Sequence, residues 1–134
     1  MPLVFRDLHA APSPALLNEE WILLENTGPG VVNAAGLTLS VARARGQRPH
    51  PLGTLSPGFV LQAGEKIRLV TGTASKASQG TPPDVSDGIR NYHLFLREPV
   101  LQRAGQILTV QLKQLEMARA VYAPGGEGGQ PTAE

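Results

Sequence analysis

Three kinds of side chain in this sequence could do chemistry: histidines, paired acids and serines. The histidines stand at positions 9, 50 and 93, without the short spacing by which paired histidines ligate zinc. Glu19 and Glu20 are adjacent, so in a strand they point to opposite sides and make a poor acid–base pair. We expect them to be solvated charges at the rim of the fold. No serine stands in the Gly-x-Ser-x-Gly turn of an esterase. The sequence therefore predicts no catalytic residue, no metal site and no enzyme activity.

Other familiar ligand-binding patterns are also missing. The sequence contains no cysteine, which excludes a disulfide framework and a cysteine zinc site. The glycine-rich end, residues 124–134, imitates a phosphate-binding loop in composition alone, because no strand pattern precedes it and no helix pattern follows it. That segment has no apolar anchor, so we expect it to be a disordered tail. No cofactor and no small-molecule substrate are expected.

An arginine-rich segment, residues 42–50, is the one candidate for nucleic-acid contact. It carries Arg43, Arg45 and Arg48, and in a strand-loop geometry the first two face the same way and could contact phosphates. The net charge of the whole chain is only +1, and no aromatic residues are interleaved for base stacking. An ordinary solvated loop is the favoured interpretation, and weak nucleic-acid binding remains the alternative.

The elements that position these residues have the pattern of short strands. The chain has 134 residues, the size of one domain, and its 15 glycines and 12 prolines are spread out, which favours a turn-rich all-β fold. Leu37, Leu39 and Val41 alternate with polar residues, as in a half-buried strand. Strands are expected over residues 3–10, 18–26 and 30–42, and as two pieces around the Ala63-Gly64 turn within 59–72.

Three segments between or after these strands are harder to assign. Residues 44–53 are expected to form a basic loop. Residues 71–91 contain almost no large apolar side chain and cannot recover their ordering entropy by burial, so they are expected to form a long mobile loop. Residues 101–123 fit either a helix or a strand hairpin that returns through Val121, and the local pattern does not decide.

The stretch Trp21–Leu24 sets the main question about function. In a strand, Ile22 and Leu24 share one face, while Trp21 and Leu23 share the other. With both faces apolar, either a loop or the N-terminal segment covers Trp21 and Leu23, or the two form an exposed patch that binds another protein or a second copy of the chain.

The order of four segments resembles the lamin tail domain family. Glu20 through Gly28 is similar to its strand that ends near Asn-x-Gly, and Val32 through Leu39 to its following strand segment. Phe59 through Gly72 is similar to two strands joined by an Ala-Gly turn. Pro99 through Gln106 resembles the element before its final strands. The resemblance covers residues 3–123, with Leu37, Leu101 and Gln106 in place of two tryptophans and an acid, and without a glycine turn in 113–119.

This resemblance implies an all-β fold, an immunoglobulin-like two-sheet β-sandwich over residues 1–123. It also implies that residues 106–123 form a closing hairpin, and that Gly36 lies where the backbone turns or approaches closely. The expected function is a noncatalytic protein-interaction or adaptor module. The arginine loop as a nucleic-acid accessory, and a self-associating structural subunit, are the alternatives.

The expected location is the cytoplasm. The N-terminus lacks a basic segment before its apolar residues, so it does not have the pattern of a signal peptide. No stretch approaches the ~18 uninterrupted apolar residues that span a bilayer, so no membrane partner is expected. The preference for arginine over lysine, with much alanine, glycine and proline, indicates a GC-rich bacterial source.

Overall fold

The computed structural model of the chain is an all-β sandwich. It describes residues 3–55, 60–113, 115–122 and 130–131. In these residues one sheet has the strand order β1-β2-β7-β8, a second has the order β11-β10-β9-β4-β5, and β3 pairs with β6 in a small third sheet. The strands are β1 Leu3–His9, β2 Trp21–Asn26, β3 Val32–Asn33, β4 Thr38–Ala42, β5 His50–Thr54, β6 Val60–Leu61, β7 Lys66–Val70, β8 Arg90–His93, β9 Ile107–Leu112, β10 Leu115–Val121 and β11 Gln130–Pro131. Three short 3-10 helices complete it: η1 Leu17–Glu19, η2 Ala77–Gln79 and η3 Val85–Asp87.

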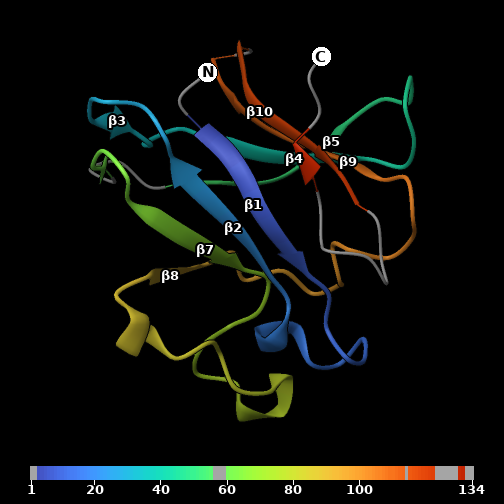
Figure 1. Cartoon of the computed structure of the whole chain (residues 1–134). Helices are drawn as coiled ribbons and strands as arrows, with labels where there is room; N and C mark the ends of the chain where they lie inside the picture. The colour runs from blue at the N-terminus through green and yellow to red at the C-terminus, as the bar shows by residue number, and fades with distance from the viewer. Residues whose placement is uncertain (1–2, 56–59, 114, 123–129, 132–134) are drawn as a thin grey trace.

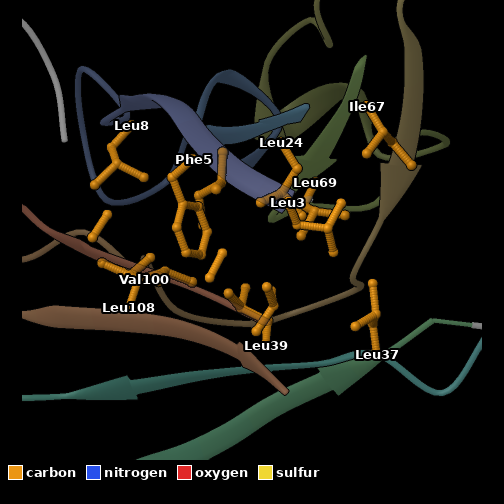
Figure 2. Packing of buried hydrophobic residues seen from close by; sticks show 14 of the residues in the cluster. Leu3, Phe5, Leu8, Leu24, Leu37, Leu39, Ile67, Leu69, Val100 and Leu108 are labelled. Atoms are coloured by element: carbon orange, nitrogen blue, oxygen red, sulfur yellow. The ribbon is translucent and has the colours of Figure 1, made fainter. Parts of the chain in front are cut away.

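The two larger sheets face each other across an aliphatic core (Figure 1). Leu3 and Phe5 from β1 face Leu39 and Leu108 from the second sheet (Figure 2), and all four are almost fully buried. Alternate residues of strands such as β1, β2 and β4 supply this core, because successive side chains of a strand point to opposite faces. The period-two pattern in the sequence therefore predicted the fold class correctly.

The hairpin of β9 and β10 replaces the helix that the local pattern allowed at residues 101–123. Leu112 pairs with Leu115, so the connection between the strands is short. Lys113 takes the left-handed conformation, with φ of 50°, which is the role that glycine plays in most such turns. The hairpin thus forms without the expected glycine turn.

Two strand predictions need correction. Residues 30–42 form two strands, β3 and β4, in different sheets, because the chain turns at Gly36, where φ is 84°. Residues 50–53, expected to lie in the basic loop of residues 44–53, belong to β5, which pairs with β4. Because β5 is an edge strand of the described sheet, it tolerates Pro51, which has no N–H to donate to a second neighbour.

Most of the tail predicted to be disordered lies outside the described residues. Its residues 130–131 form β11, which pairs with β10. Among the described residues, no helix is long and apolar enough to cross a membrane.

Candidate protein-binding surface

The outer face of the first sheet carries the two residues singled out in the sequence. Ile22 and Leu24 are fully buried, whereas Trp21 and Leu23 point to the other side and are half-buried. In the register of the sheet, Leu23 lies between Asp7 of β1 and Arg68 of β7. The predicted division of β2 into two faces is therefore confirmed.

Polar groups partly cover Trp21. The His9 ring is stacked parallel to the indole, with ring centroids 4.7 Å apart, and the Arg68 guanidinium lies 5.6 Å from the centre of the indole ring. His9 is itself fixed by a hydrogen bond to the Glu19 carbonyl. Stacking and cation–π contact of this kind each stabilise a partly exposed site by about 0.5–1 kcal/mol. Trp21 thus has two close neighbours within the domain and remains half-buried.

Arg68 also holds the segment that was expected to be a mobile loop. We name residues 72–89 the arch; they contain η2 and η3, and the chain then enters β8. The buried Arg68 guanidinium donates to the carbonyls of Asp84 and Ile89 and forms an ion pair with Asp87. The pKa of Asp87 is lowered, first by the Ile89 N–H bond and then by Arg68. The arch is therefore bound to the sheet through polar contacts rather than through apolar burial.

Asn18 forms the second anchor of the arch. Its side-chain amide lies within hydrogen-bonding distance of the carbonyls of Thr73, Lys76 and Gly80, at 2.9, 3.4 and 3.3 Å. The backbone of Gly72 approaches so closely that a Cβ atom there would lie 2.6 Å from Asn18 Oδ1. Only glycine fits this position. The arch and η1 therefore lie side by side at one end of the sandwich (Figure 1).

A different apolar surface lies at the edge of the same sheet, along β8. Phe95, just beyond this strand, is 67% exposed and has φ of 57°. Its neighbours Leu94 and Leu96 donate to the carbonyls of Val70 and Thr71 and pack against the core. Phe95 is thus forced outward in a conformation that costs a residue with a Cβ about 1–2 kcal/mol.

A surface pocket of about 490 Å³ is lined by residues of the arch and of β8. Its lining includes Val85, Ile89 and His93, and the rings of His93 and Phe95 are 6.4 Å apart. Val85 is 55% exposed. Because β8 is the last strand of its sheet in the described residues, its outer edge has no neighbouring strand there. We name Val85, Ile89, His93 and Phe95, with this edge, the β8 edge surface.

The arginine-rich segment does not keep the geometry that was expected of it. β4 ends at Ala42, and the chain then turns, with a hydrogen bond from the Gln47 N–H to the Ala44 carbonyl. Arg43 and Arg45 therefore do not continue the strand that would have aimed both at one phosphate backbone. Arg43, Arg45 and Arg48 are all exposed.

The histidines serve separate parts of the fold. His9 stacks on Trp21, His93 bonds to the Gly72 carbonyl, and His50 lies in β5. Within the described residues, no group of three or more histidine or acidic side chains is placed to hold a metal ion.

Glu20 corrects the prediction that both acids of the Glu19-Glu20 pair are solvated. Its side chain is fully buried and accepts hydrogen bonds from the Thr71 hydroxyl at 2.5 Å and from the N–H groups of Val100 and Leu101 at 2.7 and 3.1 Å. Burial raises the pKa of this carboxyl, and the three hydrogen bonds oppose part of that rise. Burial also raises the pKa of Tyr122, and the negative charge of Glu20 adds to the effect.

The raised pKa makes a prediction for stability against pH. The folded protein holds the Glu20 proton more tightly than the unfolded chain, in which the carboxyl titrates near its ordinary value of 4.5. The protonated Glu20 carboxyl therefore makes its full contribution to the free energy of unfolding below that value. The contribution is lost as pH rises through the folded-state pKa. We expect the unfolding free energy of the wild type, measured relative to Glu20→Gln in urea titrations, to fall as pH rises above the ordinary carboxyl value of 4.5. A relative stability that rises with pH would contradict the assignment.

Comparison with known family profiles and curated proteins finds no relative of this chain. No protein-family profile matches the sequence, and no curated protein matches it. The assignment of a binding surface therefore depends on the residues of this chain.

The sequence pointed to Trp21 and Leu23, which the structure places together on one face, but it did not indicate Phe95. Leu94, Phe95 and Leu96 are equally apolar in sequence, and only the backbone conformation separates the exposed residue from its half-buried neighbours.

Proposed function

We propose that this chain is a noncatalytic protein-interaction module of the lamin tail type, and that the β8 edge surface is where it meets its partner. The observation that carries the proposal is Phe95, an exposed aromatic ring in a left-handed conformation beside an edge strand. The four segments that resemble the lamin tail family, in the same order along the chain, support the assignment of the module.

Edge strands and exposed apolar side chains together suit peptide recognition. An edge strand presents backbone donors and acceptors to an added strand, and neighbouring pockets select the side chains of that strand. Here the pocket beside Val85 and His93 has the position of such a selecting pocket. Trp21 and Leu23 lie on the outer face of the same sheet, so a partner seated on the β8 edge could extend toward them.

Substituting Phe95 separates binding from folding. Asparagine tolerates positive φ better than phenylalanine does, so Phe95→Asn should keep or slightly raise the free energy of unfolding while it removes the aromatic contact.

We expect a photo-crosslinking phenylalanine analogue at position 95, in the full chain within its native cells, to form protein adducts that survive nuclease treatment.

The matched control is the same analogue at Leu115, which is 63% exposed but lies in the other sheet. Position 115 should give no such adducts. Identical adducts from both positions, or none from position 95, would refute the β8 edge surface as the binding site. Adducts that disappear on nuclease treatment would favour a nucleic-acid accessory instead.

A further inference from the structure

β8 differs from the other outer strands of the two large sheets in the described residues. β1 has a register irregularity between Phe5 and Asp7. β5 carries Pro51, and β11 carries Pro131. Bulges and prolines discourage pairing with a further strand. β8, at the end of the first sheet away from β1 (Figure 1), contains no proline, and its register with β7 is unbroken. Of these four edges, that of β8 is therefore best suited to accept another strand.

The backbone groups of Asn91 and His93 point toward this outer edge. The Leu94 N–H donates to the Val70 carbonyl of β7, so Tyr92, two positions earlier, also turns its backbone groups toward β7. The residues between them face away, because the backbone groups of a strand alternate in direction. Asn91 and His93 therefore present their N–H and C=O groups to an added strand.

An aromatic side chain and a pocket lie at equal distances from the middle of β8. Phe95, the exposed ring, stands three residues after Tyr92. Ile89 stands three residues before Tyr92 and lines the pocket of about 490 Å³, which has room for an aromatic ring. If two β8 strands pair antiparallel with Tyr92 opposite Tyr92, Phe95 of each copy lies opposite Ile89 of the other. The same register sets Asn91 opposite His93, so the outward backbone groups meet as well.

The charges at the two ends of β8 favour the same antiparallel arrangement. Arg97, beyond Phe95, is exposed and has no ion pair among the described residues. Asp84 and Asp87 lie at the other end of the strand, in the arch, and both are exposed. Antiparallel pairing brings the basic end of each copy to the acidic end of the other, whereas parallel pairing sets like charges together. The edge is thus complementary to itself in charge as well as in shape.

We propose that the partner of the β8 edge surface is a second copy of this chain. Two β8 strands pair antiparallel about a two-fold axis at Tyr92, and the first sheets of both copies join into one continuous sheet. Each Phe95 enters the pocket beside Val85 and Ile89 of the other copy. A contact of this kind uses the same surface twice and closes as a dimer. The inference rests on the proposed function, because it names the partner of the same surface.

Sedimentation velocity of the purified full chain over a concentration series tests the dimer. The mass of the wild type should rise from one chain to two. Phe95→Asn should raise the dissociation constant by about tenfold or more, because both copies lose the aromatic anchor that fills the pocket. Leu115→Asn is the matched control, since Leu115 is also exposed but lies in the other sheet; it should leave the dissociation constant unchanged.

Disulfide formation tests the register. The chain has no cysteine of its own, so an introduced cysteine can link only to another copy. A mixture of Asn91→Cys and His93→Cys chains should form a linked dimer under mild oxidation, because opposite residues of an antiparallel pair bring their Cα atoms within disulfide range. Each variant alone should link far less, since position 91 faces position 93 of the other copy.

Three results would overturn the proposal: a wild type that stays monomeric throughout the series, a dimer equally strong in Phe95→Asn, or a mixture that links no more than its separate variants. The proposed function can be judged apart from this inference. If the chain is monomeric while the analogue at position 95 still forms adducts with a different protein, the second copy is refuted and the interaction surface stands.

Discussion

Replacing Glu20 with alanine should lower the free energy of unfolding by about 2–4 kcal/mol, because three buried donors lose their acceptor at once. Two of them are the backbone N–H groups of Val100 and Leu101, and the third is the Thr71 hydroxyl. A backbone donor cannot be removed or turned away, so each must stay unpaired or admit water. Urea unfolding of the purified full chain measures the loss.

Glu98→Ala provides the control for this prediction. Glu98 is exposed and lies in the same neighbourhood, so its loss should change stability by no more than about 0.5 kcal/mol. Hydrogen exchange gives a second readout: the amides of Val100 and Leu101 should exchange faster in Glu20→Ala. An alanine variant as stable as the wild type, with unchanged exchange at these amides, would show that Glu20 does not hold this segment.

The long separation between these partners explains why the sequence did not reveal the role of Glu20. Thr71, Val100 and Leu101 stand 51, 80 and 81 residues along the chain from it. An acid beside a strand is most often solvated, and a local pattern carries no information about a distant backbone segment that needs an acceptor. The raised pKa follows from that same burial, so it was equally invisible in the sequence.

The strands themselves could be predicted because their cause is local. Ile22 and Leu24 stand two positions apart in β2, and Ile67 and Leu69 do so in β7. All four side chains are fully buried. The resemblance to the lamin tail family indicated the hairpin of β9 and β10, which the local pattern left open against a helix. β5 was missed because its proline and glycine are residues that strand patterns exclude.

The arch shows the limit of composition as a guide. Residues 71–91 contain almost no large apolar side chain, and the small apolar area that they could bury therefore indicated a mobile loop. The structure instead binds the segment through Asn18 and Arg68, which lie outside it. Amide and guanidinium groups can each satisfy several carbonyls. Two polar side chains contributed by other elements thus replace the missing apolar contacts.

Only part of the proposed partner-binding surface could be predicted from the sequence. Trp21 and Leu23 share a face because of strand geometry alone, and that part is confirmed. The stacking of His9 and Arg68 on Trp21 depends on the register of three strands, which no single strand specifies. Phe95 depends on a backbone irregularity, so its exposure could not be read from residue types.

Asn26→Ala should also be strongly destabilising, by about 2–3 kcal/mol, because its buried side chain joins three parts of the chain. The side-chain amide lies within hydrogen-bonding distance of the carbonyls of Gly30, Leu61 and Gln62, and its oxygen accepts from Gly28. This one residue therefore ties the end of β2 to the turn that follows it and to β6. Chemical unfolding, with exchange at the amides of residues 60–62, measures the effect.

Asn33→Ala is a closely matched control, since it tests the local part of the same interaction. Asn33 also accepts a hydrogen bond from the residue two positions on, Ala35, at 3.0 Å, as Asn26 does from Gly28. Asn33 is exposed, whereas Asn26 is fully buried. If the local turn supplied the stability, both alanine variants would lose a similar amount. If the buried amide bonds supply it, Asn26→Ala should lose several times more, and Asn26→Asp should lose at least as much, because a carboxylate would face three carbonyl oxygens.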